Sequence, residues 1–145
     1  FTMNKHLISL AIAMSLGIAG NAFAADAMSK DAYKAEKDKI EAQAKADKKN
    51  CDAMKANAKD ICQAEAKSKE KIAKAELDAK NKPGAKADEK VRLMKAEGDY
   101  EVAKEKCEDQ QGDAAAACKK DAKAAYDKAK TTAKQATAAD AKTKS

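Results

Sequence analysis

The side chains whose type and spacing could carry covalent chemistry are the four cysteines. Cys51 and Cys62 enclose ten residues, and Cys107 and Cys118 enclose ten more. Reactive or metal-binding thiols usually belong to a CxxC motif or have a histidine nearby, and neither accompanies these cysteines. We therefore predict no catalytic, cofactor-binding or metal-binding residue, and we assign all four cysteines to structural disulfides.

Two disulfide pairings are compatible with this spacing. On one continuous helix, Cys51 and Cys62 would lie about 16 Å apart, beyond the roughly 7 Å that a disulfide spans. Local bonds Cys51–Cys62 and Cys107–Cys118 therefore require a chain reversal inside each pair. The alternative is one long hairpin with crossed bonds Cys51–Cys118 and Cys62–Cys107. Both stay open, and we prefer the local bonds because the two cysteine segments form a degenerate repeat at a shift of 56 residues.

Local sequence signals place the chain reversals. Asn81-Lys82-Pro83-Gly84 is the clear break, since proline lacks a helix donor and glycine admits a positive φ. Gly112-Asp113 offers a C-terminal glycine followed by a capping aspartate, and Asn57 at the matching point is expected to cap, with Asp60 three residues on. Ser29 is the expected N-cap of the first helix.

The remaining composition predicts an all-α fold. Alanine, lysine and glutamate are strong helix formers, and residues 28–80 contain neither proline nor glycine. Large apolar side chains are few, so we expect two repeated helical hairpins with a sparse Ala-rich core, stapled by disulfides. They would form long antiparallel helices or a loose four-helix bundle. The expected divisions are a signal peptide over 1–24, helical repeats over 25–80 and 86–130, a Pro-Gly turn over 81–85 and a disordered tail over 131–145.

The beginning of the chain indicates export. Lys5 and His6 precede an uncharged apolar run of about 13 residues, and Ala22-Phe23-Ala24 resembles a signal-peptidase site. That run is shorter than the roughly 20 residues of a membrane-spanning helix. We therefore expect cleavage after Ala24, a periplasmic location in a Gram-negative cell envelope, and no transmembrane segment in the mature protein. Export also suits paired cysteines, because the periplasm is oxidising.

Positive charge gathers near the end of the chain. Residues 119–145 hold eight lysines and three aspartates, an excess of +5. Such a segment could make a weak contact with an anionic surface. The three tyrosines are not expected to cluster with the basic residues, so specific nucleic-acid recognition is not predicted. The segment nevertheless supports an alternative function as a cationic binder of anionic lipid, lipopolysaccharide or nucleic acid.

The Ala/Lys/Asp/Glu helices resemble the central helical region of TolA. The duplicated segment "CDAMKANAKDIC" and "CEDQQGDAAAAC" is similar to that of small exported proteobacterial proteins labelled TolA-like. The resemblance covers about Tyr33 to Lys130. It implies a non-catalytic envelope protein that acts as a spacer or protein-interaction module with an envelope protein partner. The sequence contains no motif of an enzyme.

Overall fold

The computed structural model describes residues 28–143, and the expected signal peptide over 1–24 lies outside them. The described chain forms four helices: α1 (Lys30–Cys51), α2 (Ala56–Asn81), α3 (Ala85–Cys107) and α4 (Gly112–Thr143). Each of the hairpins α1–α2 and α3–α4 carries one disulfide. The predicted all-α, disulfide-stapled fold is therefore confirmed.

The first helix and the central reversal follow from local chemistry. The Oγ atom of Ser29 accepts a hydrogen bond from the backbone N–H of Ala32 at 3.2 Å, so Ser29 caps α1 as expected. α2 ends at Asn81 and α3 begins at Ala85. The chain thus reverses around Pro83, inside the segment where the sequence placed the Pro-Gly turn.

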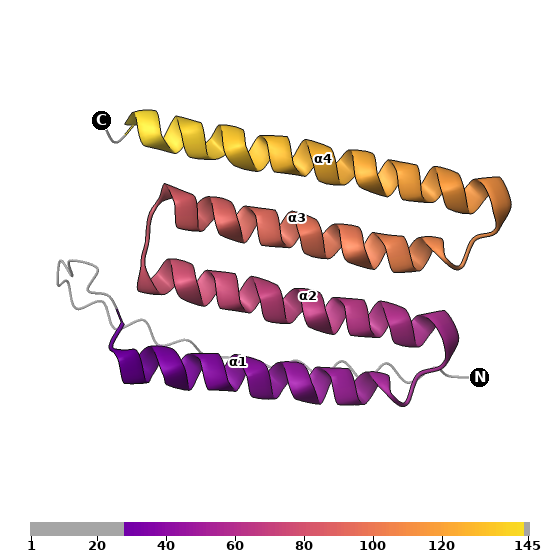
Figure 1. Cartoon of the computed structure of the whole chain (residues 1–145), viewed down its shortest axis with the longest axis horizontal. Coiled ribbons are helices and arrows are strands. Elements are labelled where there is room, and N and C mark those ends of the chain that lie inside the picture. The colour runs from indigo at the N-terminus through magenta and orange to yellow at the C-terminus, as the bar shows by residue number, and fades with distance from the viewer. Residues whose placement is uncertain (1–27, 144–145) are drawn as a thin grey trace, which may run out of the picture.

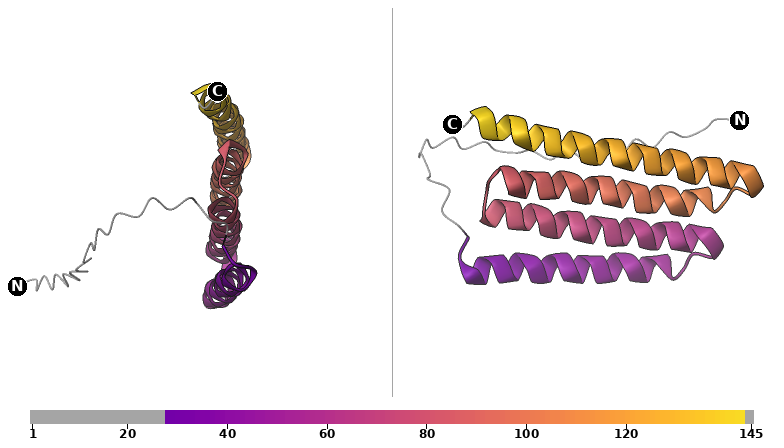
Figure 2. Two further views of the ribbon diagram at one scale, coloured as in Figure 1. Left: turned by 90° about the vertical axis from the view of Figure 1, so that its left-hand side faces the viewer. Right: turned by 45° about the horizontal axis from the view of Figure 1, so that its top comes forward.

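The four antiparallel helices lie side by side in one flat layer (Figures 1 and 2). Within residues 28–143, α1 contacts α2, α2 contacts α3, and α3 contacts α4, and no other pair of helices meets. Of the two arrangements that the sequence left open, long antiparallel helices are correct, and the layer does not close into a four-helix bundle. Both broad sides of the layer consequently face solvent.

The core of this layer is thin and rich in alanine, as the sequence predicted. A single layer can bury only the side chains along the seams between helices, and alanine allows neighbouring helices to approach closely. No charged or polar residue is buried among the described residues. The buried apolar residues are Ala44, Cys51, Ala66, Ala75, Leu77, Ala96, Cys107 and Ala133.

The seam between α2 and α3 depends on a glycine. Gly98 on α3 is buried against Ser68 on α2. A Cβ atom at position 98 would overlap the Oγ atom of Ser68 and would lie 3.0 Å from its Cβ and 3.6 Å from the Cδ1 of Ile72. The absence of a side chain at Gly98 therefore sets how closely the two hairpins pack.

The segment expected to be a disordered tail is helical as far as Thr143. It packs on α3, because Ala133 is buried and an Arg92 Nη2 N–H donates to Thr137 Oγ1 at 2.9 Å. Arg92 also lies 3.8 Å from a carboxylate oxygen of Asp140. These contacts supply the packing that an Ala-rich segment needs to remain helical, and the expectation of disorder over residues 131–143 was wrong.

None of the helices within residues 28–143 is both long enough and apolar enough to cross a membrane.

Candidate functional site

The disulfides close each hairpin locally, as we preferred. Cys51 is bonded to Cys62 and Cys107 to Cys118, with Cα atoms 5.6 Å apart in both pairs. Within each pair the first cysteine is buried and the second is half-buried. The alternative of crossed bonds between the hairpins is wrong, and all four cysteines have a structural partner.

The two disulfide loops are structural copies of each other. The backbone N–H groups of Asp52 and Met54 donate to the carbonyls of Lys49 and Cys51 at 3.1 and 3.0 Å. In the second loop, the N–H groups 56 residues further on make the same pair of bonds, each at 3.1 Å. Each loop also has one residue with a left-handed backbone, and it occupies the equivalent position in both: φ is 49° at Ala56 and 58° at Gly112. The repeat seen in the cysteine spacing therefore extends to the loop backbone.

Asn57 does not cap α2, contrary to the prediction. The N-cap residue is Lys55, and it makes no side-chain capping bond. Instead, the Nδ2 group of Asn57 donates to the backbone carbonyl of Glu105 at 2.7 Å. Glu105 belongs to α3, so this amide joins the loop of the first hairpin to the second hairpin. Asp60, expected to support the cap, lines a groove between α2 and α3.

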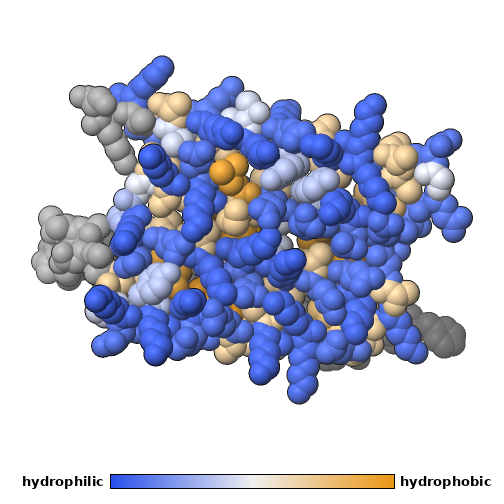
Figure 3. Space-filling view, in the orientation of Figure 1, coloured by the Kyte–Doolittle hydropathy of each residue, from blue (hydrophilic) through white to orange (hydrophobic). Residues whose placement is uncertain are grey.

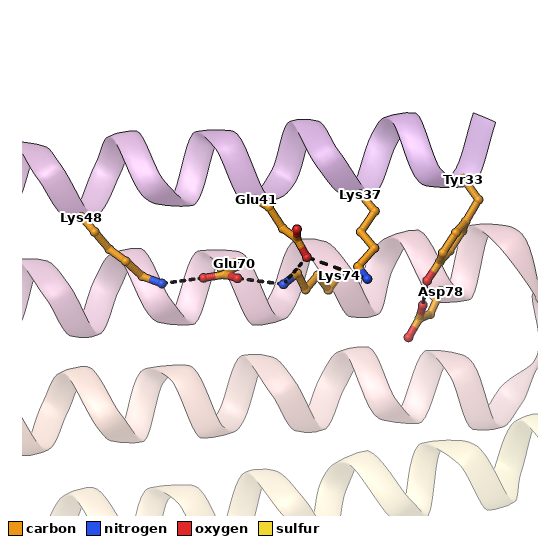
Figure 4. A network of polar contacts seen from close by, with 7 residues as sticks. All are labelled: Tyr33, Lys37, Glu41, Lys48, Glu70, Lys74 and Asp78. Carbon is orange, nitrogen blue, oxygen red and sulfur yellow. Dashed lines mark hydrogen bonds and ion pairs between the residues drawn. The ribbon is translucent and has the colours of Figure 1, made fainter. Parts of the chain in front are cut away.

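The seam between α1 and α2 carries a chain of ion pairs, shown in Figure 4. The carboxylate of Glu70 lies 2.7 Å from Lys48 and 2.8 Å from Lys74, and Lys74 lies 3.0 Å from Glu41. Lys48 and then Lys74 lower the pKa of Glu70, because both hydrogen bonds favour the charged carboxylate. Glu70 first, and then Glu41, raise the pKa of Lys74, because both carboxylates accept a hydrogen bond from its ammonium group. Ion pairs therefore accompany the buried Ala44 and the Cys51–Cys62 disulfide along this seam.

Asp78 links three helices. Its carboxylate lies 2.7 Å from Lys90 of α3 and accepts a 2.6 Å hydrogen bond from the Tyr33 hydroxyl of α1 (Figure 4). Lys90 first, and then Tyr33, lower the pKa of Asp78. The bond to the carboxylate raises the pKa of Tyr33. These contacts hold α1, α2 and α3 together close to the central turn.

The α2–α3 seam opens into a groove on each broad face, and the two grooves differ in character. The first, which we call the acidic groove, holds Glu97 paired with Lys71, and Glu101 paired with Lys104. The second, which we call the apolar groove, has apolar side chains between charged ones and a volume of roughly 540 Å³. The residues that line the apolar groove are Glu65, Ser68, Lys69, Ile72, Asp99, Val102, Ala103 and Lys106.

Two tyrosines cluster with lysines on the α3–α4 seam, and the sequence did not predict this. The rings of Tyr100 and Tyr126 stack with centroids 5.0 Å apart and planes 13° apart. The Nζ atom of Lys104 lies 5.4 Å from the Tyr100 centroid, and that of Lys130 lies 5.0 Å from the Tyr126 centroid. The expectation that tyrosines and basic residues stay apart was therefore wrong for these two rings.

The broad face of the layer seen in Figure 3 is hydrophilic over all four helices, with only scattered apolar residues between the charged ones. No group of His, Cys, Asp and Glu side chains in the described part of the chain could hold a metal ion. The polar side chains gathered on the described surface form ion pairs and line grooves.

No protein-family model matches the chain, and neither a curated protein nor a solved structure matches it. The resemblance to the TolA central region therefore stays a prediction that depends on composition and cysteine spacing.

Proposed function

We propose that this protein is a non-catalytic interaction module of the periplasmic cell envelope. The observation that carries the proposal is the single layer of helices, because it leaves both broad faces open to partners. Two disulfides and the cross-seam ion pairs hold these faces in a fixed shape. A preformed surface loses little conformational entropy when it binds.

An interaction module suits the fold better than a long spacer does. The chain reverses three times, so the layer is only about as long as its longest helix. At about 1.5 Å per residue, α4 with its 32 residues is about 48 Å long. A spacer built from the same residues would be several times longer if it remained one continuous helix.

The apolar groove is the part of this surface that best fits a protein partner. It runs between two antiparallel helices, and the apolar side chains of Ile72, Val102 and Ala103 are flanked by charged ones. An amphipathic helix binds such a groove by inserting its apolar side chains. We propose that the partner presents a helix of this kind, with charges beside its apolar stripe.

Site-specific photo-cross-linking in living cells tests this function. A photoreactive residue replaces Ala103 in the apolar groove, and the matched control replaces Ala46, which is exposed on the open side of α1. We expect one discrete cross-linked product from position 103 and little from position 46. Equal yields from both positions would contradict a groove-directed interaction.

Sequencing of the periplasmic protein should give Ala25 as its first residue, and a retained Met3 would contradict export.

A further inference from the structure

The excess positive charge of the described chain is concentrated on α4. Residues 28–143 carry a net charge of +5, and α4 contributes +3 of it through seven lysines and four aspartates. In α3, six basic and six acidic residues cancel. The helix that the sequence had assigned in part to a disordered tail is thus an ordered and basic edge of the layer.

Four of these lysines share one side of α4. Lys119, Lys123, Lys130 and Lys134 are spaced by 4, 7 and 4 residues, which places them within about 60° of one another on a helix and along about 22 Å of its length. We call them the lysine row. Two members of the row are paired with carboxylates: Lys119 with Glu108, and Lys123 with Asp127, which lies one turn further along α4.

The charge of the lysine row is only partly neutralised. Lys130 and Lys134 have no carboxylate within ion-pair distance among the described residues, although Lys123, helped by the charge of Lys130, lowers the pKa of Asp127. On the other two seams, Lys48, Lys71 and Lys90 each pair with a carboxylate of a neighbouring helix. The opposite broad side of α4 carries Asp121 and Lys128, whose charges cancel. The helix therefore presents its free positive charge on one broad face of the layer.

The tyrosine stack fixes two of the ammonium groups. Lys130 lies within cation–π distance of the Tyr126 ring and Lys104 within cation–π distance of the Tyr100 ring, so each stacked ring has one ammonium group beside it. Cation–π contacts of this kind restrict the flexible lysine side chains. The stack itself covers one face of each ring, and both tyrosines are half-buried.

We infer that the lysine row binds the surface of an anionic lipid bilayer; Lys104 of α3 is not counted with the row, because it is paired with Glu101. The row is straight and lies on a flat face, so all of its ammonium groups can approach a flat layer of headgroups at once. Single-stranded nucleic acids are bound by a basic groove together with stacking of bases on exposed aromatic rings, whereas here the two rings are half-buried and stack on each other. The geometry therefore favours lipid headgroups over nucleic acid.

Vesicle co-sedimentation of the oxidised mature chain tests the inference. The test variant replaces Lys123, Lys130 and Lys134 with glutamine. The matched control replaces three exposed lysines of α1 and α2, distant from the row and outside the apolar groove, with glutamine, so both variants lose the same charge; they are Lys34, Lys45 and Lys80. Vesicles of phosphatidylglycerol mixed with phosphatidylcholine are compared with vesicles of phosphatidylcholine alone, and circular dichroism checks the helicity of each variant.

We expect the unmodified protein to bind only the anionic vesicles and to dissociate as salt is added. Because each lysine near an anionic bilayer contributes about a factor of five, the test variant should bind on the order of a hundredfold more weakly. The control variant should change only a few-fold. Equal losses in both variants, or no binding of anionic vesicles, would overturn the inference.

Tighter binding of a single-stranded oligonucleotide than of anionic vesicles would also overturn the assignment to lipid. The result is independent of the proposed protein-interaction function, because the cross-linking position Ala103 lies in the apolar groove and none of the three test lysines lines that groove.

Discussion

Exchanging the left-handed residues of the two disulfide loops should change stability in opposite directions. Ala56 has a φ of 49° and Gly112, its equivalent in the second loop, has a φ of 58°. Only glycine adopts this conformation without a steric penalty. The first hairpin therefore contains a strained alanine where the second has a glycine, and we expect Ala56→Gly to stabilise the protein and Gly112→Ala to destabilise it.

The size of the effect follows from two opposing contributions. A left-handed backbone costs a residue with a Cβ atom about 1–2 kcal/mol. Glycine increases the conformational entropy of the unfolded chain, which offsets about 0.4–1 kcal/mol of this. A Cβ atom at Gly112 would meet nothing within 4 Å, and Ala56 is exposed, so packing adds little at either site. Each substitution should therefore change the free energy of unfolding by about 0.5–1 kcal/mol.

Thermal unfolding of the oxidised proteins, followed by circular dichroism, measures this change. For a domain of this size the expected shift in Tm is roughly 2–5 °C, upward for Ala56→Gly and downward for Gly112→Ala. The double exchange should return Tm towards that of the original protein, and any remaining difference measures the coupling of the two loops, which lie at the same end of the layer (Figure 1) and are joined by the hydrogen bond from Asn57 to Glu105. A lower Tm for Ala56→Gly, or an unchanged Tm for Gly112→Ala, would refute the reasoning.

Two further predictions concern the seams between helices. Gly98→Ala should lower the free energy of unfolding by about 1–3 kcal/mol, because the new Cβ atom would overlap Ser68 Oγ. Adding Ser68→Ala to this variant should recover part of the loss in a thermal melt. An unchanged Tm for Gly98→Ala would contradict the close packing. Lys48 and Lys74 lower the pKa of Glu70 in the folded protein below its ordinary value of 4.5. The charged Glu70 therefore adds to the free energy of unfolding at pH values above 4.5, and this stabilisation is lost as pH falls through the lowered pKa. Glu70→Gln should therefore reduce stability by about 0.5–1 kcal/mol at neutral pH, and in melts across pH the difference should vanish in acid; a difference that persists there would argue against the ion pairs.

The features that the sequence predicted correctly depend on neighbouring residues. Ser29 caps α1 through the backbone three residues on, and Pro83 interrupts the helix in which it would otherwise lie. The distance between cysteines on a helix showed that a local Cys51–Cys62 bond requires a reversal. In each case the decisive interaction spans only a few residues, so composition and spacing were sufficient.

The features that the sequence did not predict depend on which helices become neighbours. Tyr100 and Tyr126 are distant along the chain and stack only because α3 and α4 pair in one register. Asn57 is a reasonable capping residue until Glu105 of the other hairpin offers it a carbonyl. The Ala-rich segment after Thr131 has the composition of either a helix or a disordered tail, and its contact with Arg92 decides between them. A single layer and a four-helix bundle can likewise be built from the same amphipathic helices, so the sequence did not distinguish between them.

The open edges of the layer differ in chemistry from the joint between the two hairpins. The joining surface between the hairpins includes Ile72 on α2 and Val102 on α3. At a shift of 56 residues, their equivalents on the outer helices are Lys128 and Ala46, and both are exposed. An additional hairpin would find a charge or a methyl group where the existing joint has branched aliphatic side chains. The outer faces of α1 and α4 therefore differ from the joint between the hairpins, as the faces of terminal repeats differ from internal ones.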